Sequence, residues 1–134
     1  MRLSDVTAPG QYAGMAVSPD FRDLVLDQLA ALAPQIKRMF GGAGLFRDGL
    51  MFAVLDDDRL YFKVDEASRP RFEAAGMGPF EYAEGKRALG YFEVPADVFE
   101  DSTQLVEWAQ TAIAVAVSKS AAKPKARRKR AIGK

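Results

Sequence analysis

The sequence predicts an α+β fold: a two-layer sandwich in which an antiparallel sheet of about five strands carries its helices on one face. Two patterns indicate this class. Apolar residues recur at helical spacing near both ends of the chain, whereas the middle consists of short apolar runs divided by turn residues. The expected order is one helix, three strands, a short helix, two strands and a final helix.

The first helix is expected to begin at Ser18 and to end before Pro34. The Ser18 hydroxyl can cap the first turn, and Pro19 suits the first helical position, where its missing N–H would have no partner in any case. Residues 1–17 show no apolar periodicity and are expected to form an N-terminal arm. The predicted buried stripe consists of Phe21, Leu24, Val25, Leu29 and Leu32.

Three consecutive antiparallel strands are expected over residues 36–46, 50–55 and 60–64. Asp48 and Gly49 separate the first two, and Asp-Gly between apolar runs is a strong hairpin signal. The middle strand is apolar at every position. It is therefore expected at the centre of the sheet, covered on both faces.

The second half of the chain adds a short helix over residues 68–75, two strands over 80–82 and 89–94, and a final helix. Either Asp101 or Ser102 can cap this last helix. Its apolar face is expected to consist of Leu105, Trp108, Ala109, Ala112, Ile113 and Ala116.

Charge divides the chain into an acidic body and a basic end. The 134 residues carry 19 Lys and Arg against 18 Asp and Glu, a net charge of +1. Eight cations and no anion follow residue 117, which leaves residues 1–117 with a net charge of −7. We therefore expect a folded domain over residues 18–117 and a flexible basic tail over 118–134. The tail cations are Lys119, Lys123, Lys125, Arg127, Arg128, Lys129, Arg130 and Lys134.

The residue types that the chain lacks narrow its chemistry. It contains neither Cys nor His. This removes disulfides, thiolate metal sites, cysteine nucleophiles and the imidazole base. No stretch approaches the ~20 apolar residues of a membrane span, and residues 1–5 do not resemble a secretion signal. We expect a cytoplasmic protein that has no cofactor, does not bind membranes and is not an enzyme.

Two clusters near the middle of the chain are candidate ligand sites. The backbone of Gly41, Gly42 and Gly44 could bind phosphate, but a strand follows where a helix would be needed, so a sharp bend or bulge is favoured. Three consecutive acids, residues 56–58, could bind a hard cation. Without further ligands at suitable spacing, they are expected to be solvated at a turn.

One predicted sheet face combines aromatic and cationic residues. Tyr61, Lys63, Tyr82 and Tyr91 could stack against the bases of single-stranded nucleic acid. Glutamates beside them disfavour that role, and the signature of RNA-recognition domains is absent. Ordinary sheet packing or a dimer contact is therefore favoured for these residues.

Four segments carry a family resemblance. Their sequences are Arg38-Met39-Phe40-Gly41-Gly42-Ala43-Gly44-Leu45-Phe46, Leu60-Tyr61-Phe62-Lys63-Val64, Gly76-Met77-Gly78-Pro79-Phe80 and Tyr91-Phe92-Glu93-Val94-Pro95. In order and spacing they resemble the N-terminal domain of TfoX/Sxy-type competence regulators, over residues 18–117. The motif residues expected to be structural are Met39, Phe40, Gly41, Gly42, Gly44, Tyr61, Phe62 and Lys63.

The resemblance implies a two-layer α/β sandwich and a stand-alone N-terminal domain. Full-length regulators of this type carry a second, helical domain and promote transcription of DNA-uptake genes together with a cyclic-AMP receptor protein. The resemblance supplies no catalytic residues. It implies a regulatory binding module that contacts a protein partner.

The basic tail suggests a second, electrostatic contact. Clustered cations gain affinity for DNA or RNA by releasing counterions, largely independently of sequence. The alternative is a homodimeric assembly or adaptor protein that binds no nucleic acid, in which a second copy covers the apolar middle strand. An enzyme that uses Tyr61, Lys63 or a carboxylate ranks last, because these residues form no recognised catalytic arrangement.

Overall fold

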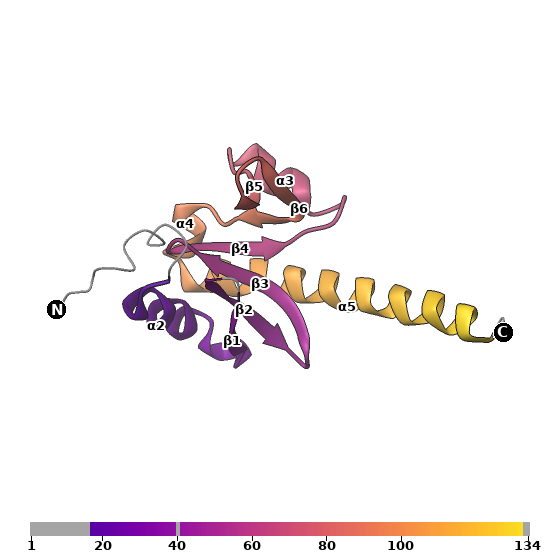
Figure 1. Ribbon diagram of the computed structural model, residues 1–134. Helices are drawn as coiled ribbons and strands as arrows, with labels where there is room; N and C mark the ends of the chain where they lie inside the picture. Colours follow the sequence, from indigo (N-terminus) through magenta and orange to yellow (C-terminus); the bar gives the residue numbers. More distant parts are fainter. Residues whose placement is uncertain (1–16, 40, 133–134) are drawn as a thin grey trace.

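The structure is a computed structural model that describes the backbone of residues 17–39 and 41–132 and the side chains of residues 17–39 and 41–121. Its centre is one six-stranded antiparallel sheet with the strand order β1-β2-β3-β4-β6-β5 (Figure 1). The strands are β1 (Gln35–Met39), β2 (Gly42–Arg47), β3 (Leu50–Asp56), β4 (Arg59–Lys63), β5 (Pro79–Ala83) and β6 (Lys86–Glu93). The predicted N-terminal arm lies outside the described residues, except for residue 17.

The first and last helices begin where the sequence predicts caps. They are α2 (Pro19–Gln28), the 3-10 turn η2 (Ala30–Leu32), α3 (Arg69–Ala74), α4 (Ala96–Phe99) and α5 (Ser102–Ile132). At the start of α2, Ser18 Oγ accepts a hydrogen bond from the Phe21 N–H at 3.1 Å. Asp101 Oδ1 caps α5 by accepting from the Thr103 N–H at 3.1 Å. Only the single turn of α4 has no counterpart among the predicted helices.

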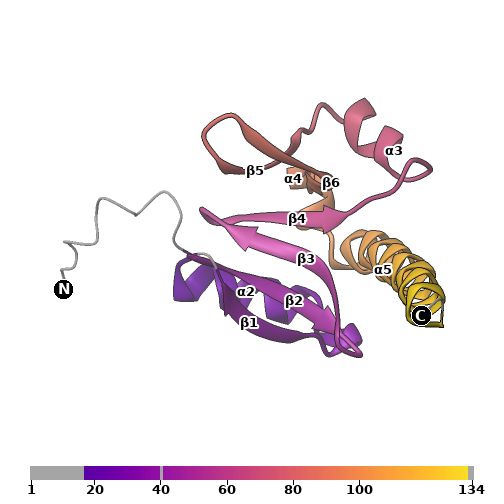
Figure 2. The ribbon, with the colours of Figure 1, turned by 45° about the vertical axis from the view of Figure 1, so that its right-hand side comes forward.

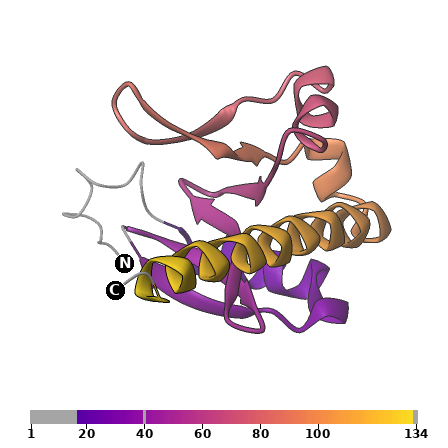
Figure 3. The same cartoon turned by 90° about the vertical axis from the view of Figure 1, so that its right-hand side faces the viewer.

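The helices cover one face of the sheet, as predicted. Figures 2 and 3 show α5 lying against the strands, and its main strand neighbours are β3 and β4. Side chains from α2, α3, α4 and α5 meet those of the sheet in one core. Its fully buried members include Val25, Leu29, Leu45, Phe52, Leu55, Phe62 and Leu105. The predicted α+β fold class is confirmed.

The strand predicted over residues 36–46 consists of two strands. Gly41 has φ 82°, a conformation that L side chains disfavour, and the chain reverses there between β1 and β2. A Cβ atom on Gly42 would clash with the carbonyl oxygen of Leu55 on β3. The glycine-rich segment is thus a tight turn followed by close strand packing, as the structural interpretation predicts; Phe40 lies outside the described residues.

The middle strand of the prediction, β3, is central and buried on both faces. Phe52 and Leu55 are fully buried toward the helices, and Val54 is 1% exposed on the other face. That second face is covered within the chain, because Val54 packs with Tyr61 and Phe80. No second copy is needed to explain the apolar strand.

The last helix is longer than predicted. The sequence pattern predicts an end near residue 117, yet α5 continues to Ile132. Of residues 119–132, most are Ala, Lys or Arg, which are strong helix formers, and the helix continues through Ser120 and Pro124. The end of α5 runs beyond the sheet (Figure 1). The division of the chain into arm, domain and tail stays a prediction.

We expect Gly42→Ala to destabilise the fold strongly. The added methyl group would meet backbone, which cannot move aside as a side chain can, so the loss should be at least about 2 kcal/mol. Gly90→Ala is the matched control in β6, because nothing lies within 4 Å of its Cβ position. Urea unfolding of both variants checks this. Equal stabilities would contradict the close approach of β2 and β3.

Candidate functional site

The face of the sheet opposite the helices carries a small second core. Val54, Tyr61 and Phe80 are buried there, and the rings of Tyr61 and Phe80 lie 5.0 Å apart between centroids. Met51 and Tyr91 pack at its border. This cluster joins β3, β4, β5 and β6, so the face is apolar at its centre.

The aromatic and cationic residues predicted for one face are brought together, but they form no open stacking surface. Tyr61 is only 8% exposed. The Lys63 ammonium lies 4.8 Å from the ring centroid of Tyr91 and donates to its hydroxyl at 3.4 Å. Burial raises the pKa of Tyr91 to about 12. Tyr82 remains 49% exposed beside Phe80. The arrangement supports the sheet-packing interpretation.

A pocket of about 300 Å³ lies beside this cluster at the turn between β3 and β4; we call it the acidic pocket. Its walls come from β3, β4, β5 and the turns that follow β3 and β5. The lining residues are Asp56, Asp57, Arg59, Tyr61, Glu81, Tyr82, Ala83 and Glu84. Four of them are carboxylates, and one is a cation. The Arg59 guanidinium also forms an ion pair with Glu93, which does not line the pocket, at 3.7 Å between the guanidinium nitrogen and the carboxylate oxygen.

Asp56 is the unusual residue of the acidic pocket. Its side chain is 7% exposed, and its Oδ1 atom is buried without a hydrogen-bond partner. Burial, and secondarily the charge of Asp57, raises the pKa of Asp56 from 3.8 to about 6. The neighbouring Tyr61 hydroxyl also has a raised pKa, mainly through burial and then through Glu93. A buried, unpaired carboxylate costs free energy that a bound donor would recover.

The other two predicted acids form the turn itself. Asp57 and Asp58 have φ values of 55° and 53°, as in a type I′ hairpin turn. Asp58 accepts a hydrogen bond from the Ser18 N–H at 2.8 Å. Among the described residues, no group of three acidic side chains is placed to hold a metal ion. The solvated-turn interpretation thus fits Asp57 and Asp58 but not Asp56.

The sequence contains a signal for the position of Asp56. Side chains alternate between the two faces of a strand, and Asp56 comes two residues after Val54. In the structure Asp56 opposes Arg59 as Val54 opposes Tyr61, so all four share one face. Glu81 and Glu84 join the pocket through the folding of β5 alongside β6, and no local pattern predicts that.

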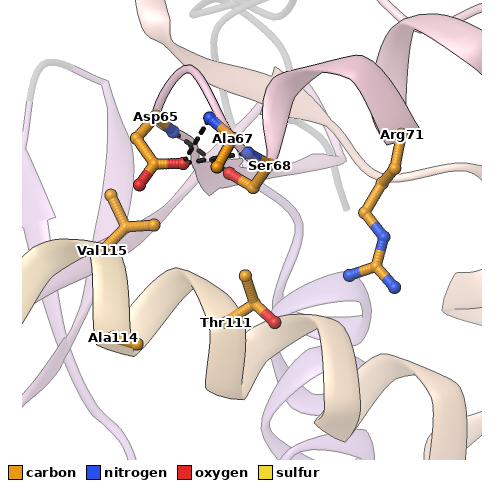
Figure 4. A pocket seen from close by; sticks show the side chains of 7 residues that line it. All are labelled: Asp65, Ala67, Ser68, Arg71, Thr111, Ala114 and Val115. Atoms are coloured by element: carbon orange, nitrogen blue, oxygen red, sulfur yellow. Dashed lines mark hydrogen bonds between the residues drawn. The ribbon is translucent and has the colours of Figure 1, made fainter.

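A second hollow of about 390 Å³ lies between α5 and the start of α3 (Figure 4). The Asp65 carboxylate accepts from the N–H groups of Ala67 and Ser68 at 3.1 and 2.9 Å, and these bonds lower its pKa. Arg71 lies over the Trp108 ring, 4.2 Å from its centroid. The polar groups of this hollow are therefore engaged in structural contacts.

The predicted nucleic-acid contact falls on the end of α5. Lys119 is exposed. The other tail cations up to Arg130 lie on the helical backbone, but their side chains are outside the described part, as is Lys134 entirely. We call residues 119–130 the basic segment. Within the described residues, no helix is both long and apolar enough to cross a membrane.

Comparison with known proteins places most of the described chain in one family. The family model described as "TfoX N-terminal domain" matches residues 27–116, which include the whole sheet. The chain is also similar to a protein of Aliivibrio fischeri named "DNA transformation protein TfoX1". The two are 35% identical over 66 residues, which is 48% of this chain and 31% of the relative. The chain thus matches about a third of that protein's length.

We predict that Asp56 makes stability depend on pH. Because its native pKa of about 6 exceeds 3.8, the folded state binds the proton more tightly than the unfolded state. The resulting stabilisation is present below pH 4 and is lost as the pH rises through 6. The wild type should therefore gain about 2 kcal/mol relative to Asp56→Asn between pH 7.5 and pH 4.5.

Urea unfolding of both proteins at the two pH values measures this difference. Asp48→Asn is the control, because it removes an exposed carboxylate from the turn between β2 and β3. If wild type and Asp56→Asn respond equally to pH, the carboxylate of Asp56 is not in the environment described.

Proposed function

The chain belongs to the TfoX N-terminal domain family, and we propose that it is a regulatory binding module of DNA transformation. In this proposal the folded part contacts a protein partner, and the basic segment contacts nucleic acid. The match over residues 27–116 carries the proposal, because it spans the sheet and much of the helical layer packed on it. The relative named for DNA transformation indicates the process.

The chemistry of the chain favours binding over catalysis. The TfoX-type domain defines a regulatory family rather than a known enzyme family. Without His and Cys, the chain lacks the residues that most often serve as base and nucleophile. A regulator needs surfaces of suitable shape and charge instead, and this chain offers an acidic body and a basic helix end.

The geometry of α5 supports a contact between the basic segment and nucleic acid. Seven cations fall within residues 119–130, a length of about 17 Å at 1.5 Å per residue. The segment runs beyond the edge of the sheet, so the body does not cover it (Figure 1). A duplex carries about one phosphate charge per 1.7 Å of its axis, so several cations can each displace a counterion. Such binding depends on salt and little on sequence.

The homodimer alternative was based on an apolar β3 that a second copy would cover, and the structure no longer requires such a cover. Val54 is buried by Tyr61 and Phe80 of the same chain. The oligomeric state stays a prediction, which light scattering tests. Nothing in the burial of β3 favours a second copy over a different protein partner.

We expect the basic segment to dominate binding of a labelled DNA duplex. Replacing Arg127, Arg128, Lys129 and Arg130 by Gln keeps helix propensity and removes four charges. Affinity at low salt should fall by at least about 10-fold, and the slope of log K against log salt should decrease in size by about 1 to 4. Fluorescence anisotropy over a salt series measures both quantities.

The matched control removes the same charges from the body. Arg22, Arg38, Lys86 and Arg87 are exposed, and changing them to Gln alters the same residue types in equal numbers. This variant should keep most of the affinity and the salt slope. If both variants lose affinity equally, net charge rather than the basic segment governs binding. If neither does, the proposed contact through residues 127–130 is excluded.

A further inference from the structure

The acidic pocket has the charge of a site for a cation. Asp56, Asp57, Glu81 and Glu84 contribute four carboxylates against the single guanidinium of Arg59. That guanidinium is itself shared with Glu93. Glu81 also accepts from the Gly85 N–H at 2.8 Å, which fixes its position on the turn between β5 and β6. The pocket therefore keeps an excess of negative charge that its own residues do not neutralise.

The buried carboxylate of Asp56 is the independent sign of a ligand. It is more than nine-tenths buried, it lines the pocket, and its Oδ1 atom has no donor among the described residues. Buried carboxylates are normally paired or fully hydrogen-bonded, because their desolvation is costly. A cationic donor in the pocket would neutralise Asp56 at close range.

The walls of the pocket suit an organic cation better than a metal ion. Tyr82, which is 49% exposed, supplies aromatic surface beside the acids, the largely buried Tyr61 lines the pocket next to it, and aromatic rings attract ammonium and guanidinium groups. The described acidic side chains do not converge as metal ligands do. A guanidinium or ammonium group on an aliphatic stem matches both the apolar and the charged walls of a pocket of about 300 Å³.

We propose that the acidic pocket binds the cationic end of an arginine or lysine side chain presented by a basic segment of a protein partner. This deepens the proposed function by giving the folded domain its partner-binding surface. Asp57, Glu81 and Glu84 are exposed at the rim, where they can meet further cations of the same segment. Residues 1–117 carry a net charge of −7, which attracts such a partner over a longer range.

The chain's own basic segment is not placed to fill the pocket. Figure 1 shows the turn between β3 and β4 at the left of the sheet, whereas the basic segment belongs to the part of α5 that runs out beyond the right-hand side of the sheet. The two sites of one chain are therefore proposed to bind different partners: the acidic pocket binds a basic protein segment, and the basic segment binds a polyanion.

The test uses the full chain and a labelled, end-blocked heptapeptide in which glycines alternate with two lysines and a central arginine. The neutral control is the same peptide with citrulline in place of arginine and acetyllysine in place of both lysines. At pH 8, where the Asp56 carboxylate is ionised, the arginine peptide should bind at least about 10-fold more tightly than the citrulline peptide. Fluorescence anisotropy at low salt measures both affinities.

Three variants locate the binding. Asp56→Asn should weaken binding of the arginine peptide by at least about 10-fold, because the buried acceptor loses its charge. Asp57→Asn should weaken it by about 3-fold. Asp48→Asn is the matched control: it has φ 53° against 55° for Asp57 and lies at the other end of β3, so its affinity should stay within 2-fold. Asn tolerates this left-handed conformation, so both turn variants should fold.

Three outcomes would overturn the proposal. The first is equal binding of the arginine and citrulline peptides. The second is an equal loss in Asp57→Asn and Asp48→Asn, since the effect would then be one of net charge. The third is binding of N-acetylarginine amide as tightly as the peptide, which would make the occupant a small organic cation. The duplex titration distinguishes a failure of the pocket proposal from a failure of the proposed function. If the peptides do not bind at the pocket but the duplex still binds, only the pocket proposal is refuted.

Discussion

The burial of β3 on both faces is the constraint on which the other features depend. One face of this strand packs beneath α5 through Phe52 and Leu55, and the other is covered by Tyr61 and Phe80. Because a central strand must accept neighbours on both edges, β2 has to approach closely enough that position 42 admits only glycine. Gly42 and the motif aromatics Tyr61 and Phe62 thus serve the packing of the same strand.

The same constraint produces the acidic pocket. Asp56 is the last residue of β3 and lies on the same face as Val54. It is therefore buried like the rest of this strand, although its side chain can carry a charge. A solvent-exposed strand would leave this carboxylate hydrated and unremarkable in its pKa. The Tyr61 that covers Val54 also forms a wall of the pocket, and Glu81 arrives on β5, which is held in place by Phe80. The polar site is therefore an extension of the second core and cannot be separated from it.

Most of the helices and strands could be predicted from the sequence, and the features that could not be predicted depend on tertiary contacts or on patterns that fit more than one structure. The apolar run of β3, the Asp-Gly turn and the caps at Ser18 and Asp101 are local signals, and the structure confirms the elements that they predict. The glycines predict a sharp bend, but the complete reversal at Gly41 is not predicted, because the apolar residues on both sides are compatible with one continuous strand. The length of α5 depends on a balance between Ala, Lys and Arg and a single Pro124. The acidic pocket joins acids 24 to 28 residues apart, and only the tertiary fold brings them together.

The separation of charge along the molecule gives the two proposed contacts a physical basis for acting together. The acidic pocket and the basic segment would attract each other if they were adjacent, and each would then mask the other. The helix α5, with 31 residues, holds them apart, since it packs against β3 and β4 and its end runs beyond the sheet. Exposed charges separated by more than about 8–10 Å are largely screened at physiological salt. A partner bound at the pocket, as proposed, would therefore leave the basic segment free to meet a polyanion, and the length of α5 would make the two proposed contacts compatible.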